Sequence, residues 1–131
     1  MVENERKLIK GLEAKGLLPW EPGMMAICPD GDHHLVIYVN ESGERLKVDS
    51  FDSRLLQPKD CTHAPCDALV GWLVGQLQDR DGAVVEIRNY GEGVRVECYI
   101  KGGQKDFIDG KGKTLLEALL RAFVEKLEAE K

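Results

Sequence analysis

The strongest structural signal in the chain is GKGKTLLEALLRAFVEKL, which runs from Gly110 to Leu127. Thr114 and Glu117 have the spacing of a capping box, in which each side chain accepts a hydrogen bond from the other residue's backbone N–H. Leucine and phenylalanine then recur at helical spacing and form one broad apolar face. Glu117, Arg121 and Glu125 should lie on the opposite side. This helix needs a large apolar partner, which the preceding chain offers as a sheet.

The chain before this helix contains a hairpin rich in glycine at its turn, between Ala83–Asn89 and Val94–Lys101. Apolar and polar residues alternate along its second strand, which is typical of an antiparallel sheet with one packed face and one wet face. The loop Gly102–Gly112 contains Phe107 and Ile108, and we expect it to add a short edge strand.

A second hairpin is predicted nearer the N-terminus. The run Leu35–Val39 is β-branched and aromatic, and Arg45–Asp49 alternates so that Leu46 and Val48 point inward. Met24–Cys28 is a short apolar run and is also predicted to be a strand.

Two further helices are predicted, Glu3–Lys15, with Gly16 as its C-terminal cap, and Pro65–Gln78. Gly71 and Gly75 lie four apart in the second, which suggests close approach of another backbone because glycine otherwise weakens a helix. The segment Phe51–Ala64 shows no periodicity, and we expect a loop there.

The order of these elements predicts an α+β fold, with an antiparallel sheet of hairpins and helices packed mainly on one face. A length of 131 residues fits a single domain, 1–131, in which 1–51 supplies a helix and a hairpin and 56–131 a helix-hairpin-helix unit. The expected core is Leu69, Trp72, Leu73, Val85, Ile87, Val94, Val96, Ile100, Leu119, Phe123 and Leu127.

Composition limits the function classes. The net charge of −5 argues against a protein that coats nucleic acid, because phosphate binding depends on clustered lysine and arginine. No run approaches the roughly 18 apolar residues of a membrane span, and the N-terminus lacks the apolar core of a signal peptide. We therefore expect a cytoplasmic protein with no membrane partner, whose four cysteines are thiols.

The segment from Asp60 to Asp67 is the best candidate for chemistry in the sequence, because it contains three side chains of the kinds that ligate zinc: Cys61, His63 and Cys66. A tetrahedral zinc site would need a fourth ligand, from Cys28, His33 or His34. The spacing departs from the C-x2-C frameworks of zinc sites, so we expect no metal and no cofactor here but a polar loop that covers a helix end. The alternatives are a zinc site and a Cys–His catalytic pair, although nothing marks which cysteine and histidine would pair.

Basic and aromatic side chains alternate on the polar face of the second hairpin: Arg88, Arg95, Tyr99 and Lys101. Such a face can form a platform on which nucleic-acid bases stack. Glu86 and Glu97 dilute its charge, so an ordinary solvated sheet face is the preferred interpretation, and nucleic acid is not the expected partner.

Three features of the C-terminal part carry a family resemblance: the helix Ala68–Val74, the hairpin Val84–Ile100 and the ending Gly112–Ala122, with its Thr, Ala and apolar-x-Arg-Ala pattern. Through them, residues from Leu56 to Lys131 resemble the phage ABA-sandwich family of small phage and prophage proteins. The sequence departs from the family at Leu120, where cysteine is frequent. The resemblance implies a phage-related protein and transfers no catalytic residue.

We therefore expect a non-catalytic protein-interaction module with an unknown protein partner. The alternatives are a nucleic-acid-binding module that uses the polar sheet face and, third, a small enzyme dependent on cysteine and histidine. A homodimer is favoured over a monomer, because the expected edge strands lack an obvious guard and Trp20 is expected to be exposed.

Overall fold

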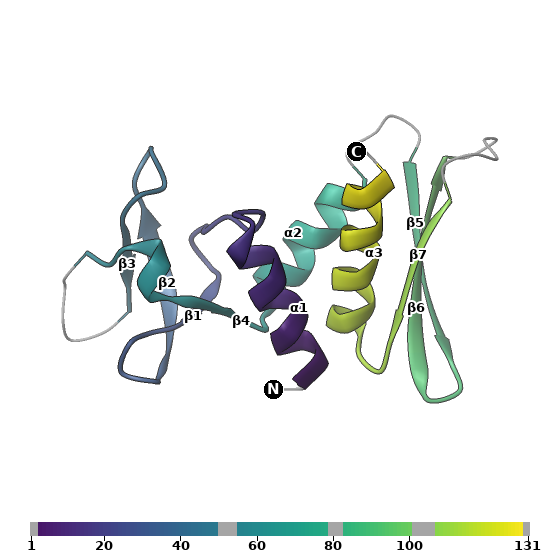
Figure 1. Cartoon of the computed structure of the whole chain (residues 1–131), viewed down its shortest axis with the longest axis horizontal. Coiled ribbons are helices and arrows are strands. Elements are labelled where there is room, and N and C mark those ends of the chain that lie inside the picture. Colours follow the sequence, from purple (N-terminus) through teal and green to yellow (C-terminus); the bar gives the residue numbers. More distant parts are fainter. Residues whose placement is uncertain (1–2, 50–54, 79–82, 101–106, 130–131) are drawn as a thin grey trace. The chain divides into compact units, whose positions relative to one another are not determined.

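The computed structural model describes residues 3–49, 55–78, 83–100 and 107–129 (Figure 1). These residues form three α-helices and two antiparallel sheets, so the predicted α+β class is confirmed, although the strands form two sheets and not one. The chain divides into two compact units, which we call the C-terminal unit (Met1–Leu8 with Val70–Lys131) and the middle unit (Ile9–Leu69). The single-domain organisation stays a prediction.

The middle unit contains a four-stranded sheet in the order β3 (Leu46–Val48), β2 (His33–Val39), β1 (Met25–Ile27) and β4 (Thr62–Ala64). All neighbours are antiparallel. The predicted hairpin and first strand are confirmed. The prediction of a loop over Phe51–Ala64 is wrong at its end, where a 3-10 turn and β4 form; residues 50–54 lie outside the described part. Three residues are too few for β4 to show a periodic pattern.

One face of this sheet carries the apolar core of the middle unit. Leu46 and Val48 are buried there, as the alternation of β3 predicts. The cluster consists of Ala26, Cys28, Val36, Leu46, Val48 and Cys61, with Trp20, Val39 and Leu56 packed against it. Trp20 is therefore partly buried, and the expectation that it is exposed is wrong.

Helix α1 (Glu3–Ala14) matches its predicted extent and ends as the sequence indicates. Gly16 adopts a φ of 68°, the left-handed conformation that glycine tolerates, and its N–H donates to the Glu13 carbonyl at 2.9 Å. The Leu17 N–H donates to the Leu12 carbonyl at 3.0 Å, which completes a Schellman-type cap.

The C-terminal unit contains a three-stranded sheet in the order β5 (Ala83–Tyr90), β6 (Gly93–Ile100) and β7 (Ile108–Gly112). The predicted hairpin is confirmed, and β7 is the expected short edge strand. Within this unit, α3 (Leu115–Ala129) runs along the sheet and contacts β7 and β6 (Figure 1). The face of β5 has no comparable cover from a described helix.

Two glycines in β7 let α3 approach closely. A Cβ at Gly110 would overlap the backbone of Ala118 and Ala122, and one at Gly112 would lie 2.6 Å from the Glu117 carboxylate. Glu117 is consequently only 2% exposed, so its predicted place on the solvent side is wrong.

One of the two predicted hydrogen bonds of the capping box forms at the start of α3, and the other has a different donor. The Glu117 N–H donates to the Thr114 hydroxyl at 3.1 Å. The Glu117 carboxylate accepts from the Lys113 N–H at 2.8 Å, one residue before the predicted donor. The buried carboxylate is thus hydrogen-bonded at the positive end of the helix dipole.

The predicted core is largely confirmed. Leu69, Leu73, Val96, Leu119 and Phe123 are buried, and the others are partly buried: Trp72, Val85, Val94 and Leu127. Ile87 contradicts the prediction, since it is 48% exposed on a strand that no described helix covers. The Ile100 side chain lies outside the described part.

The glycines of α2 (Asp67–Leu77) also differ from the prediction. A Cβ at Gly71 or Gly75 would meet no described atom within 4 Å, so neither marks a close backbone contact. No helix in the described ranges combines the length and apolar character needed to span a bilayer.

Candidate functional site

The polar face of the three-stranded sheet carries the residues predicted as a binding face. Arg88 in β5 is directly opposite Arg95 in β6, and Tyr99 lies further along β6 on the same face. Lys101 falls outside the described residues. Alternation along the strands therefore gathers the three described side chains as predicted.

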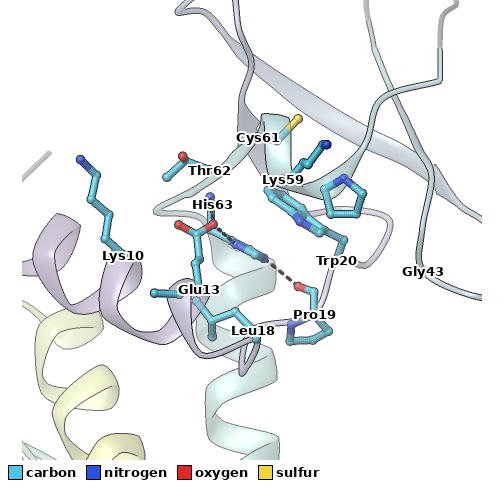
Figure 2. A pocket seen from close by; sticks show the side chains of 13 residues that line it. Lys10, Glu13, Leu18, Pro19, Trp20, Gly43, Lys59, Cys61, Thr62 and His63 are labelled. Carbon is cyan, nitrogen blue, oxygen red and sulfur yellow. Dashed lines mark hydrogen bonds and ion pairs between the residues drawn. The ribbon is translucent and has the colours of Figure 1, made fainter.

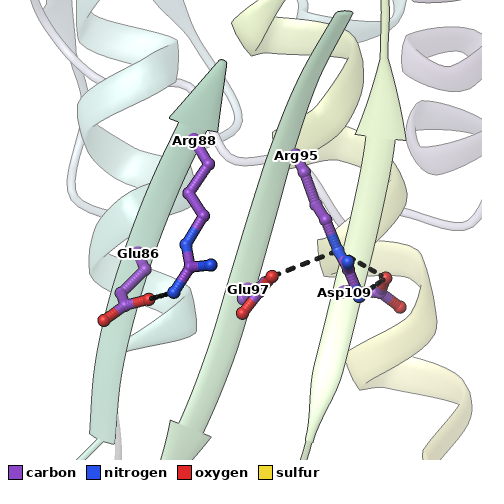
Figure 3. Close-up of polar contacts among 5 residues, drawn as sticks. All are labelled: Glu86, Arg88, Arg95, Glu97 and Asp109. Carbon is purple, nitrogen blue, oxygen red and sulfur yellow. Dashed lines mark hydrogen bonds and ion pairs between the residues drawn. The ribbon is translucent and has the colours of Figure 1, made fainter. Parts of the chain in front are cut away.

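The charges on this face form two parallel rows across the strands. One row is positive: Arg88, Arg95 and Lys111. The neighbouring row is negative: Glu86, Glu97 and Asp109. Figure 3 shows five of these six side chains; each arginine leans toward the carboxylates of the acidic row.

Ion pairs between the rows neutralise the arginines. Arg88 lies 2.7 Å from the Glu86 carboxylate, and Arg95 lies 3.2 Å from Glu97 and 3.0 Å from Asp109. The hydrogen bond from Arg88 holds the pKa of Glu86 below its ordinary value. A nucleic-acid phosphate would have to displace these carboxylates, which lowers the suitability of the face for that ligand.

The outer edge of β7 is occupied by side chains of α3. Arg121 donates to the Lys111 carbonyl oxygen at 3.2 Å. This bond satisfies an outward backbone carbonyl that another strand would otherwise pair with.

The outer edge of β5 is different. Tyr90 and Gly93 are paired across a two-residue turn, so they form a hydrogen-bonded pair. Counting back from Tyr90, the backbone N–H and C=O groups of every second residue of β5 point toward β6. The N–H and C=O groups of Val85, Ile87 and Asn89 consequently point away from the sheet. No residue in the described ranges hydrogen-bonds to them.

Both edges of the four-stranded sheet have partners. Leu56 exchanges two backbone hydrogen bonds with Leu46 at the β3 edge, at 2.9 and 2.7 Å. At the β4 edge the His63 N–H donates to the Glu13 carboxylate at 2.9 Å. The β5 edge is thus the exception among the four sheet edges as far as the described chain extends.

His63 also lines a pocket in the middle unit (Figure 2). Its ring is 1% exposed and stacks on Trp20 with centroids 3.7 Å apart. Nδ1 lies 2.7 Å from the Glu13 carboxylate, and Nε2 lies 2.7 Å from the Pro19 carbonyl oxygen. Both ring nitrogens are therefore engaged within the fold, so neither is directed at a metal or at a substrate proton.

The pocket beside this ring has a volume of about 680 Å³, and Cys61 lies in its wall. Burial raises the pKa of the Cys61 thiol to about 12, with a smaller contribution from Cys28. At neutral pH Cys61 is therefore a thiol and a poor nucleophile. The Cys66 sulfur accepts from the Leu69 N–H at 3.4 Å, at the start of α2, as the helix-end interpretation of this loop suggests.

Potential metal ligands are gathered elsewhere, at the β1–β2 turn. Ligand atoms of Asp30, Asp32 and His34 all lie within 4.8 Å of one another, the sole such group in the described ranges. The two ring nitrogens of His34 already bond Asp30 and the Asp49 carbonyl, at 3.1 and 3.0 Å. The turn is thus explained by its own hydrogen bonds. Cys61, His63 and Cys66 do not form such a group, and the expectation of no metal stays a prediction.

Sequence reasoning missed the two most specific features of these sites. Glu13 and His63 are 50 residues apart, and no local pattern joins them. The free edge of β5 had a partial signal, since the two-residue turn at Gly91 fixes which amides point outward. What the turn does not show is that α3 covers β7 and leaves β5 open.

Comparisons with known proteins add no assignment. Known protein families, curated protein sequences and solved structures all give no significant match to the chain. The resemblance to the phage ABA-sandwich family stays a prediction.

Proposed function

We propose that the protein is a non-catalytic protein-interaction module that binds a strand of its partner at the β5 edge. The observation that carries this proposal is the contrast between that edge, with outward amides at Val85, Ile87 and Asn89, and the other three, which are hydrogen-bonded. In strand addition, the main chain supplies affinity and side chains beside it supply specificity.

Apolar side chains beside the edge support the same proposal. Ile87 and Tyr90 are 48% and 49% exposed. A bound strand would cover part of both, which adds burial of apolar surface to the main-chain hydrogen bonds.

The two alternative functions have less support. For nucleic-acid binding, the arginines of the sheet face are already paired with Glu86, Glu97 and Asp109. For a cysteine–histidine enzyme, the His63 ring has both nitrogens engaged and Cys61 has a raised pKa. Neither side chain meets the requirement for an activated thiolate beside a free base.

Affinity capture from the native host, with the bound protein and nucleic acid both analysed, tests the proposal. We expect one stoichiometric protein at salt concentrations that screen phosphate contacts, and its loss with Ile87→Lys, which adds a charge to the edge. The matched control is Ile37→Lys, because Ile37 is 49% exposed on a central strand of the other sheet.

Two results would overturn the proposal. A salt-sensitive nucleic-acid pool without a protein partner, abolished by Arg95→Glu, would establish the nucleic-acid alternative. Selective labelling of one cysteine by a thiol-directed activity probe, again without a protein partner, would favour the enzyme.

A further inference from the structure

The β5 edge carries a charge pattern that is complementary to itself. Ile87 is flanked by Glu86 and Arg88, whose side chains lie on the polar face, while the backbone groups of Ile87 point outward. When two copies of an antiparallel edge meet about a two-fold axis, residues opposite each other have positions that sum to a constant. The outward-pointing residues must pair with each other to form hydrogen bonds.

Three registers place the two-fold axis near the middle of β5: through Glu86, through Arg88 or through Ile87. An axis through Glu86 would place the carboxylates of the two copies directly opposite, and an axis through Arg88 would do the same with the guanidinium groups. An axis through Ile87 places Glu86 opposite Arg88 of the second copy, twice. Only this third register has opposite charges at its centre, and it places them in non-hydrogen-bonded pairs, whose side chains are closer than those of hydrogen-bonded pairs.

The same register also matches the remaining side chains. Tyr90 would lie opposite Val84 of the second copy, an aromatic and β-branched pair of the kind that stabilises antiparallel strands. On the other face the two Ile87 side chains would meet, which covers an apolar group that is exposed in the single chain. Charge, apolar burial and hydrogen-bond direction therefore select one arrangement.

We propose that the strand bound at the β5 edge is β5 of a second copy of this chain, paired antiparallel about Ile87 into one continuous sheet. This inference rests on the proposed function and names its partner. A contact made chiefly by one strand belongs among the small interfaces. We therefore expect a reversible dimer with a dissociation constant of about micromolar order.

Charge exchange at the edge tests the register directly. Glu86→Arg gives one copy two positive residues around Ile87, and Arg88→Glu gives another copy two negative ones. We expect each variant alone to dimerise about tenfold more weakly or worse, because like charges then face each other. An equimolar mixture of the two should form a heterodimer, and the double variant carrying both changes should regain the homodimer.

Sedimentation equilibrium over a wide concentration range measures each mass, with circular dichroism as a check on folding. Glu44→Arg, at an exposed position of the middle unit, is the matched charge-reversal control and should not change the dissociation constant. Ile87→Pro removes an outward N–H without touching the β5–β6 ladder, so it should abolish the dimer and leave a folded monomer.

A wild-type chain that is monomeric at every concentration overturns the self-pairing. So does a dimer that is indifferent to both charge reversals and to Ile87→Pro. If the chain is monomeric and Ile87→Lys still loses a different captured protein, the self-pairing fails while the proposed function stands. If neither association depends on Ile87, both fail.

Discussion

The two edges of the three-stranded sheet differ in how far other parts of the chain cover them. At β7, Gly110 lets α3 contact the strand closely, and Arg121 donates to the outward Lys111 carbonyl. At β5, larger side chains surround Ile87, and its outward N–H and C=O have no partner in the described residues. The β7 edge is covered because a glycine lets the helix approach it. The β5 edge is uncovered in the described part of the chain, and charged side chains flank its central residue.

This difference shows that edge protection is local. One helix covers β7 and part of β6, and its width leaves β5 beyond reach. Native sheets normally block exposed edges against pairing with other chains. The eight-residue β5 edge has no hydrogen-bond partner in the described residues, whereas each of the other three edges has at least one, and this contrast supports the proposed binding role.

The largest expected effect comes from breaking the closed edge. Gly110→Val puts a branched side chain into the backbone of α3, so we expect a loss of about 3 kcal/mol or more in the free energy of unfolding. Urea denaturation measures it. Gly75→Ala is the matched control, because its Cβ enters open space in a helix and should stabilise by up to about 1 kcal/mol. A neutral Gly110→Val would mean that α3 does not pack on β7.

The second prediction concerns the β4 edge of the four-stranded sheet, where the Glu13 carboxylate accepts from the His63 N–H. Glu13→Ala removes the acceptor of both the His63 N–H and its buried ring, so we expect a loss of about 2–4 kcal/mol. The exposed Glu21→Ala serves as control and should change stability by less than about 0.5 kcal/mol. Equal effects of the two changes would show that Glu13 does not hold His63.

Sequence patterns predicted those parts of the molecule that depend on neighbouring residues. Thr114 and Glu117 marked the start of α3, Gly16 the end of α1, and alternation the strands of both hairpins. The fourth strand of the middle unit was missed because β4 is formed by pairing with β1, which lies more than 30 residues earlier. The burial of Glu117 depends on the absence of a side chain at Gly112, a contact that helical periodicity does not encode.

A smaller effect is expected where the sheet is open. Ile87→Ala, measured at a concentration low enough to keep the chain monomeric, should cost less than about 1 kcal/mol, because nearly half of the side chain is already exposed. Leu119→Ala, on the face of α3 that packs inward, should cost about 2–5 kcal/mol. Comparable losses in urea denaturation would place Ile87 in the core and remove the basis for an open edge.

The smallest effect is a pH dependence at the β1–β2 turn. The hydrogen bond to Asp30, and then that to the Asp49 carbonyl, raise the pKa of His34 above the ordinary value of about 6.5. Its stabilising contribution is therefore complete below about pH 6.5 and is lost as the pH rises through the folded pKa. An NMR titration of the His34 ring should give a raised pKa that Asp30→Asn returns toward normal; a pKa at or below 6.5 in the unchanged protein would contradict this.

The position of the middle unit within the chain bears on how the protein is made. Ile9–Leu69 is one uninterrupted segment, whereas the C-terminal unit combines the first residues with Val70–Lys131. During synthesis, all contacts of the middle unit can close once Leu69 has left the ribosome. Glu5 must wait for Thr114, a hydrogen-bond partner 109 residues later. Contacts of such long sequence separation slow folding, so the open β5 edge belongs to the unit that is completed last.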